Sequence, residues 1–231
     1  MGGATYTPTA TSTSGLTVTI TVASLSSSIC SISGGVVSFQ AVGTCTLDAN
    51  QAGNGNYNAA TQVSQGVLVI GSPTAVTLTN GGGGTSRTVG SGDIATVTFN
   101  DALQPTSICS SWTGTGTKSV NNAVVSFTNN GNNDYFTATS SSCTGLGNFG
   151  TVSTGASYVS GNVTFSSSTI TWNPGSDTLT FTLGSNVSGS NKISSNVTMG
   201  YPGYTADPQM TDTSGNPIST TTFTSTTKSG F

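Results

Sequence analysis

The chain of 231 residues contains no histidine and no glutamate, and only 5% of its residues are charged. Without histidine it lacks the usual general base of serine and cysteine hydrolases and the commonest metal ligand in proteins. Its seven acidic residues are all aspartates, and none lies in a recognisable paired-carboxylate motif. These absences argue against an enzyme. We therefore expect no catalytic residue, no cofactor and no bound metal.

Basic side chains are equally scarce, with three lysines, one arginine and a net charge of −3. Nucleic-acid binding depends on clustered lysine and arginine to neutralise phosphates, so we exclude a nucleic-acid partner. No charged-then-apolar signal sequence and no apolar run of roughly 18 residues occurs. We expect a mature, truncated or viral chain that does not insert into a membrane.

The scarcity of charge also bears on self-association. A nearly uncharged surface has little repulsion between copies, and sheet edges without lysine or glutamate invite strand addition. Self-association, or association with other surface-protein domains, is one expectation. A monomer kept soluble by hydrated threonine and asparagine is the alternative.

Apolar residues recur at every second position, as in Leu16, Val18, Ile20 and Val22, which alternate with threonine. This period is typical of a β-strand with one buried face. Further strands are predicted over residues 29–32, 36–42, 45–47, 63–70, 76–78, 94–99, 123–127, 135–138, 148–152, 158–165, 168–172 and 178–183. Strands this short and numerous predict an all-β sandwich.

Turn residues support the same class. Ser33-Gly34-Gly35, Asn130-Gly131 and residues 173–176 each separate two predicted strands and predict hairpins. Trp112 and Trp172 are interpreted as core anchors, because an isolated tryptophan in a strand usually packs inside.

The four cysteines fall into two local pairs, Cys30 with Cys45 and Cys109 with Cys143. Neighbouring or facing strands can close the 15-residue separation of the first pair, and that bridge would stabilise the fold by roughly 3 kcal/mol. Buried free thiols are the alternative, but this small unit has few large apolar side chains from which to build a core. We predict two disulfides and hence an oxidising compartment.

Residues 3–70 resemble a bacterial immunoglobulin-like repeat found in tandem in large secreted and surface-anchored proteins. The matching positions are Gly3, Tyr6, Pro8, residues 14–16 before a Val/Thr/Ile strand, Cys30, residues 41–45 and residues 51–60. Such repeats usually have a strand before the Gly-x-x-Tyr turn, whereas this chain begins at Met1-Gly2-Gly3. Either the chain was cut or processed inside a repeat, or a strand of another molecule fills the gap. The resemblance implies an open groove beside the Leu16–Val22 strand or the last strand of the unit.

The second part resembles another immunoglobulin-like module of bacterial surface proteins. Asp101-Ala102-Leu103 after a strand matches its opening, and residues 211–217 match its closing turn. Together the resemblances imply two tandem immunoglobulin-like β-sandwich domains, residues 1–71 and 72–231, each with one disulfide. Residues 71–74 mark the boundary, because Pro73 interrupts strand pairing. The Ser/Thr-rich tail from residue 202 either docks a last strand or gives it to a neighbour.

The second part also contains two minor candidate sites. Residues 212–216 carry oxygens at alternate positions, but an Asx-type turn explains them better than calcium, because no glutamate closes the loop. Lys118 and Lys192 are candidates for an isopeptide bond, although solvated lysines are the better interpretation.

The sequence therefore favours a non-enzymatic structural subunit of a bacterial surface appendage, filament or adhesin, secreted or held at the cell surface, which associates by domain stacking or strand complementation. A module that binds a glycan or host surface through exposed Tyr57, Tyr201 and Tyr204 is the second reading. A phage or virion decoration protein is the third.

Overall fold

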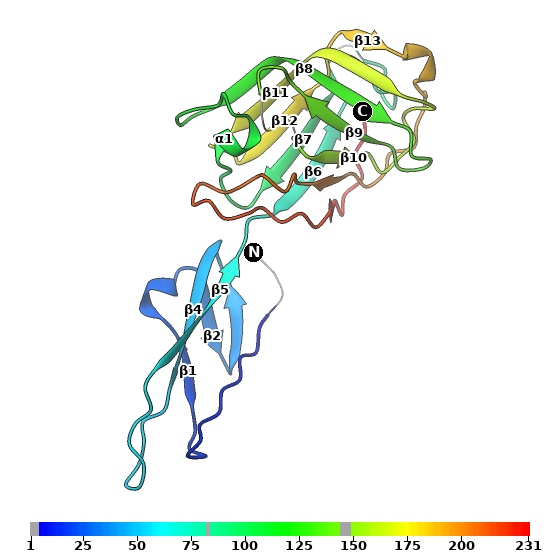
Figure 1. The fold of residues 1–231 in the computed structure, drawn as a ribbon. Coiled ribbons are helices and arrows are strands. Elements are labelled where there is room, and N and C mark those ends of the chain that lie inside the picture. Colours follow the sequence, from blue (N-terminus) through cyan, green and yellow to red (C-terminus); the bar gives the residue numbers. More distant parts are fainter. Residues whose placement is uncertain (1–4, 82–83, 144–148) are drawn as a thin grey trace. The chain divides into compact units, whose positions relative to one another are not determined.

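A computed structural model describes residues 5–81, 84–143 and 149–231 of the chain. The structure is mostly β, as Figure 1 shows, and this confirms the predicted β-rich fold. The chain divides into two compact units, Met1–Ile70 and Gly71–Phe231.

The first unit consists of two small antiparallel sheets. In its described part, one sheet has the order β1 (Thr19–Val22), β4 (Gly43–Asn50) and β5 (Val63–Val69). The other is the hairpin of β2 (Cys30–Ser33) and β3 (Val36–Phe39). The predicted turn between them is confirmed, since Gly34 and Gly35 adopt φ values of +57° and +79°, a backbone region that glycine enters without steric cost.

A short 3-10 helix, η1 (Ser24–Ser26), follows the end of β1. The buried Ser26 hydroxyl donates to the Thr44 carbonyl oxygen at 3.1 Å and accepts from the Thr46 amide at 3.0 Å. The Ser26 side chain thus takes the place of a neighbouring strand for these two backbone groups of β4. Buried backbone groups need such hydrogen-bond partners.

The core of the first unit is small. Only Cys30, Val37, Cys45 and Leu47 are fully buried apolar residues in its described part, and partly buried neighbours pack around them. A disulfide between Cys30 on β2 and Cys45 on β4 joins the two sheets through this core. Because the first unit buries so little apolar surface, the disulfide contributes a large part of the stability of this unit.

The second unit is larger and is built on one long sheet of ten strands in its described part. The order is β15-β14-β10-β9-β8-β11-β12-β7-β6, and β13 pairs with β11. Their bounds, with one helix and one 3-10 helix, are β6 (Pro73–Thr79), β7 (Ile94–Phe99), α1 (Pro105–Ile108), β8 (Lys118–Thr128), β9 (Tyr135–Thr139), β10 (Thr151–Ser153), β11 (Val163–Asn173), β12 (Thr178–Thr182), β13 (Asn186–Ser188), η2 (Ser190–Lys192), β14 (Gly203–Thr205) and β15 (Phe223–Thr224). Both predicted hairpins of this unit, β8–β9 and β11–β12, are present.

The two ends of this sheet approach each other, so that the sheet is nearly closed into a barrel. The last residues run beside β6, where Gly230 forms a parallel bridge with Thr79 and the Ser229 hydroxyl accepts from the Leu78 amide at 2.9 Å. The Phe231 ring is buried against Phe127 and Tyr158. Of the two alternatives for the tail, the structure therefore has the one in which it docks on its own unit.

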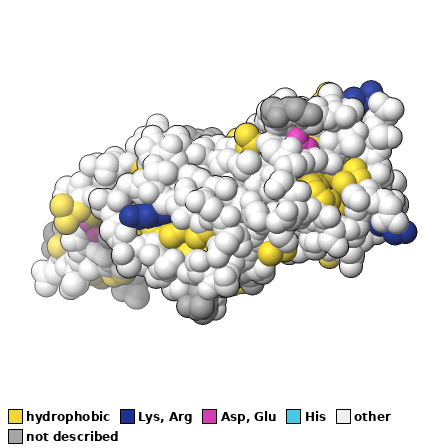
Figure 2. Space-filling view, turned by 90° about the horizontal axis from the view of Figure 1, so that it is seen from above, with side chains coloured by type: hydrophobic (Ala, Val, Ile, Leu, Met, Phe, Trp, Pro, Cys, Tyr) yellow, Lys and Arg dark blue, Asp and Glu magenta, His cyan; other side chains and the backbone are white. Residues whose placement is uncertain are grey.

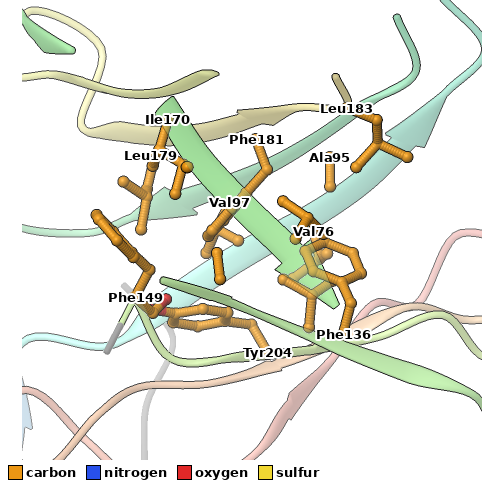
Figure 3. Packing of buried hydrophobic residues seen from close by; sticks show 14 of the residues in the cluster. Val76, Ala95, Val97, Phe136, Phe149, Ile170, Leu179, Phe181, Leu183 and Tyr204 are labelled. Carbon is orange, nitrogen blue, oxygen red and sulfur yellow. The ribbon is translucent and has the colours of Figure 1, made fainter. Parts of the chain in front are cut away.

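Apolar side chains from facing strands fill the space inside this sheet (Figure 3). Trp112 and Trp172 are 4% and 0% exposed, which confirms both as core residues. The Phe99 ring meets Trp172 and Tyr204 edge-on, with centroid distances of 6.2 and 5.7 Å. Such contacts add to the burial of the rings themselves.

Three strand predictions need correction. Pro73 does not interrupt strand pairing. It is buried and is the first residue of β6, a position at which a proline can stand without breaking a hydrogen bond of the sheet. The predicted strands 158–165 and 168–172 form one strand, β11, which starts only at Val163 and carries a bulge near Ser168. In the predicted strand 148–152, Asn148 lies outside the described residues, and β10 begins at Thr151.

Candidate functional site

Both predicted disulfides are present. Cys30 pairs with Cys45 and Cys109 with Cys143, and no cysteine of the four is left free. Disulfides of this kind are typical of proteins that mature outside the cytoplasm. Among the described residues, no helix is both long and apolar enough to cross a membrane.

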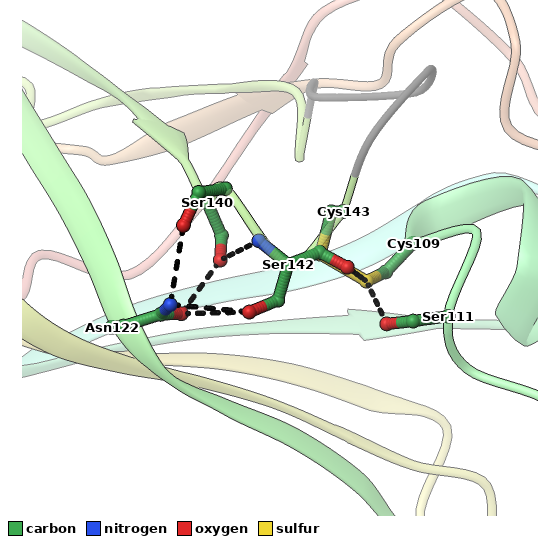
Figure 4. Close-up of a disulfide and its surroundings, with 7 residues drawn as sticks. Cys109, Ser111, Asn122, Ser140, Ser142 and Cys143 are labelled. Carbon is green, nitrogen blue, oxygen red and sulfur yellow. Dashed lines mark hydrogen bonds between the residues drawn. A yellow bond between two sulfur atoms is a disulfide. The ribbon is translucent and has the colours of Figure 1, made fainter.

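Polar side chains surround the second disulfide (Figure 4). The Asn122 amide oxygen accepts from the hydroxyls of Ser140 and Ser142 at 2.8 and 3.3 Å, and its nitrogen donates to the Ser142 hydroxyl at 3.1 Å. The Ser111 hydroxyl lies 3.3 Å from the Cys109 sulfur. This network holds the turn that precedes Cys143, so the bridge is a structural cross-link between that turn and the end of α1.

The three tyrosines predicted to contact a ligand differ in how exposed their side chains are. Tyr204 is fully buried, and its hydroxyl donates to the Phe149 carbonyl oxygen at 2.8 Å. Burial, and to a lesser extent Asp207, raises the pKa of this phenol far above its usual value. The prediction was wrong for Tyr204, because its ring is needed to fill the core next to Phe99. Tyr57 and Tyr201 are 52% and 49% exposed, in different units.

Tyr201 borders an open hollow of about 520 Å³ on the second unit. Met199 and Lys228 also line it, and the Lys228 ammonium lies 5.4 Å from the Tyr201 ring centroid. That distance is suited to a cation–π contact. The hollow therefore combines one aromatic ring, one cation and several hydroxyl side chains.

Buried aspartates of the second unit accept hydrogen bonds from backbone amides. The Asp93 carboxylate accepts from the amides of Gly81 and Gly90 at 2.8 and 2.7 Å, and burial raises its pKa. The Asp212 carboxylate accepts from the amides of Ser214 and Asn216, both at 2.8 Å, which forms the predicted Asx-type turn. In the described part of the chain, no group of three or more acidic or cysteine side chains could hold a metal ion.

One concave surface of the first unit is a groove of about 380 Å³. Its floor is the inward face of the β1-β4-β5 sheet, where Ile20, Ala49 and Val63 stand in register on the three strands. Its wall is the extended segment from Tyr6 to Thr13, which we call the lead-in. A second hollow on the β2–β3 side shares Pro8, Val18 and Ile20 with the groove. The inner face of this sheet is thus only partly covered.

The described residues that line the groove include no charged side chain. Its floor includes Val63, which is 65% exposed, and the buried Gln51, which follows Cys45, Leu47 and Ala49 at every second position. Sequence reasoning missed Gln51 as a site residue. The signal was present, since Gln51 directly follows β4 and continues its inward alternation with a polar residue where the pattern is otherwise apolar.

The rest of the surface offers little electrostatic contrast. Figure 2 shows one face on which the few charged side chains are isolated among uncharged ones. A comparison with models of known protein families found no match, and neither did comparisons with curated proteins and with solved structures. Function is therefore inferred from the groove, the disulfides and the charge.

Proposed function

We propose that the chain is a non-enzymatic, extracellular structural subunit of a bacterial surface appendage or adhesin, built from tandem immunoglobulin-like domains. It associates with neighbouring domains by adding strands to incompletely paired sheets. The observation that carries this proposal is the partly covered inner face of the first unit, with its uncharged groove over Val18 and Ile20. Sandwich domains normally bury such a face completely.

Three further features support this role. The two disulfides suit a protein that works outside the cytoplasm. The edge strand β5 ends its sheet within the described residues and exposes Leu68 to 47%. It carries no lysine, glutamate or proline, the residues that protect natural sheet edges from pairing. An unprotected edge of this kind suits a protein that meets neighbours of similar structure.

The proposal is tested by sedimentation and electron microscopy of the purified, unreduced chain, alone and with extracts of the cell surface that carries it. We expect concentration-dependent assembly or incorporation into larger particles. Hydrogen exchange should show amides of β5 and of the lead-in becoming protected on assembly. A monodisperse monomer whose first unit resists proteases without any partner would contradict the proposal.

Glycan binding is a second candidate function, because the hollow beside Tyr201 pairs a half-exposed ring with Lys228 and hydroxyl groups. An aromatic face and hydroxyl side chains suit a sugar ring, and the ammonium favours an acidic one. A glycan array compares the unaltered chain with Tyr201→Ala and with Tyr57→Ala, the matched exposed tyrosine of the other unit. Loss of signal in Tyr201→Ala alone supports this role, and no signal for the unaltered chain eliminates it.

A further inference from the structure

We propose that Asn54 in the first unit is a site of spontaneous deamidation, at which the chain converts its own asparagine into aspartate and isoaspartate. The inference goes beyond the proposed function and does not depend on it. It rests on a comparison of the three Asn-Gly pairs of the sequence, Asn54-Gly55, Asn80-Gly81 and Asn130-Gly131. The fold leaves the first pair reactive and holds back the other two.

The reaction uses the backbone nitrogen of Gly55 as the nucleophile. A bond forms between this nitrogen and Cγ of Asn54, and the nitrogen gives its proton to a base in the solvent. The bond from Cγ to Nδ2 breaks, and the amide nitrogen takes up a proton and leaves as ammonia. Water then opens the five-membered imide at either carbonyl, which yields aspartate or isoaspartate. Glycine suits the position after the asparagine, because it has no Cβ to crowd the nitrogen and turns freely.

The attacking nitrogen of Gly55 is free. Asn54 and Gly55 are both exposed, and the Gly55 amide donates no hydrogen bond to any described residue. No heavy atom lies within 4 Å of a Cβ added at Gly55. Solvent base can therefore reach the amide proton, and no hydrogen bond has to break before the nitrogen attacks.

The carbonyl group under attack is polarised by two backbone amides. The side-chain oxygen Oδ1 of Asn54 accepts from the Asn56 amide at 2.8 Å and from the Tyr57 amide at 3.0 Å. Negative charge develops on this oxygen as the nitrogen attacks, and fixed donors aimed at such an oxygen stabilise the transition state. A backbone hydrogen bond of 2.8 Å from the Asn54 amide to the Tyr57 carbonyl oxygen holds the turn that carries both donors.

The fold withholds the attacking nitrogen of the Asn80-Gly81 pair. The buried Gly81 amide donates to the Asp93 carboxylate at 2.8 Å. Removing the amide proton would bring two negative charges together, so the carboxylate opposes the reaction. Backbone atoms of Gly92 also pack directly against Gly81, which prevents the rotation that the attack needs.

The Asn130-Gly131 pair is an internal control, because it is exposed like the first pair but its nitrogen is engaged. The Gly131 amide donates to the side-chain oxygen of Asn129 at 3.0 Å. This hydrogen bond must break before the nitrogen can attack. Solvent exposure alone would make Asn54 and Asn130 react alike, whereas the hydrogen bonds favour Asn54.

The product differs from the starting chain in charge. Asp48 is the single charged side chain among residues 1–70, so each conversion at position 54 doubles the number of acidic side chains there. Aspartate at this position accepts from the same two amides in charge-assisted hydrogen bonds. Isoaspartate adds a carbon atom to the main chain and disturbs the bridge between Asn54 and Tyr57.

The test incubates the full, unreduced chain in mildly alkaline buffer made with oxygen-18 water. Peptide mass spectrometry over time then measures deamidation at each pair, and an enzyme that methylates isoaspartate identifies that product. We expect Asn54 to react about tenfold faster than Asn130, whose glycine amide must first give up a hydrogen bond, and Asn80 to stay unconverted. Reaction at Asn130 or Asn80 as fast as at Asn54, or no reaction at Asn54, would overturn the inference.

The reduced chain in urea separates the effect of the fold from that of the sequence. Without structure the three pairs should react at similar rates, and Asn54 should react no faster than in the folded chain. If Asn54 is selected equally in urea, the fold is not the cause and the inference is wrong. If Asn54 reacts more slowly folded than unfolded, the two donors do not activate it.

Two variants complete the test. Gly55→Ala places a methyl group in open space and crowds the attacking nitrogen, so deamidation at Asn54 should slow by roughly tenfold or more. Asn54→Gln should abolish reaction at this position, because its longer side chain would have to close a six-membered ring. The rate at Asn130 should be unchanged in both variants. Undiminished deamidation at Asn54 in Gly55→Ala would refute attack by the Gly55 nitrogen.

Discussion

The hydroxyl of Tyr204 on β14 donates a 2.8 Å hydrogen bond to the carbonyl oxygen of Phe149, inside the core of the second unit. Both residues are fully buried. The bond joins two segments that lie 55 residues apart in the sequence. It also leaves no space at Gly150, where an added Cβ would lie 2.4 Å from the Tyr204 hydroxyl. Tyr204 is therefore a structural residue of the core.

The first prediction concerns this bond. Tyr204→Phe keeps the ring and removes the hydroxyl, so the Phe149 carbonyl loses a partner. We expect the free energy of unfolding of the second unit to fall by about 1–2 kcal/mol. Denaturant unfolding followed by tryptophan fluorescence measures it, because both tryptophans lie in this unit. Tyr201→Phe, at a half-exposed position, should change it by less than about 0.5 kcal/mol. Equal effects of the two variants would contradict this role.

The second prediction concerns the first disulfide. The double variant Cys30→Ala with Cys45→Ala removes a cross-link worth roughly 3 kcal/mol from a unit with a very small core. We expect residues 5–70 to lose their dispersed NMR signals, while the tryptophan fluorescence of the second unit stays unchanged. Retention of the native NMR pattern in the first unit would show that its core suffices without the bridge.

The third prediction concerns a close backbone approach in the second unit. A Cβ at Gly184 would lie 2.0 Å from the Ser166 carbonyl oxygen, next to the β11 bulge, where the Ser168 hydroxyl accepts from the Gly184 amide at 2.9 Å. Because backbone atoms cannot move aside, Gly184→Ala should destabilise the unit by about 2–3 kcal/mol, as measured by denaturant unfolding.

The control for that variant is Gly55→Ala. No heavy atom lies within 4 Å of a Cβ added at Gly55, and its φ is not in the left-handed region. We expect a change of less than about 0.5 kcal/mol. A Gly184→Ala protein as stable as this control would mean that the bulge relaxes without cost.

The fourth prediction is a pH dependence. Burial, assisted by Asp212 and Asp177, raises the pKa of Asp101 above the usual 3.8, and burial also raises the pKa values of Asp93 and Asp177. A raised carboxyl pKa means that the folded state binds protons more readily than the unfolded state. The resulting stability is complete below pH 3.8 and is lost as the pH rises through the folded-state values.

We therefore expect the free energy of unfolding to increase when the pH is lowered from neutral towards about 4. Asp101→Asn keeps an oxygen to accept from the Ala102 amide and removes the repulsion from its acidic neighbours. It should stabilise the unit at neutral pH and flatten the pH profile. Urea titrations at several pH values measure both effects, and a stability that falls steadily on acidification would contradict them.

The agreement between sequence and structure is greatest where the determining contacts are local. The Gly34-Gly35 and Asn130-Gly131 turns were predictable because positive φ and side-chain turns depend on neighbouring residues. The pairing of the cysteines followed from short separations that adjacent strands can close. The Asx turn at Asp212 is local in the same sense.

The disagreements occur where burial depends on distant partners. Alternation could not show that Tyr204 is buried and Tyr201 is half exposed, since the answer depends on whether Phe99 and Phe149 lie opposite. Nor could Pro73 be recognised as a buried strand start, because this requires the pairing of β6 with β7.

By itself, then, the sequence determined a β-rich, disulfide-linked and nearly uncharged chain, because strand period, turn chemistry and composition are properties of short segments. Only the tertiary structure decided that ten strands of the second unit share one sheet among the described residues, and that Phe231 helps to close it. It also decided that Gln51 faces a partly covered groove. These depend on which strands pair across long separations, and a local pattern does not encode that choice.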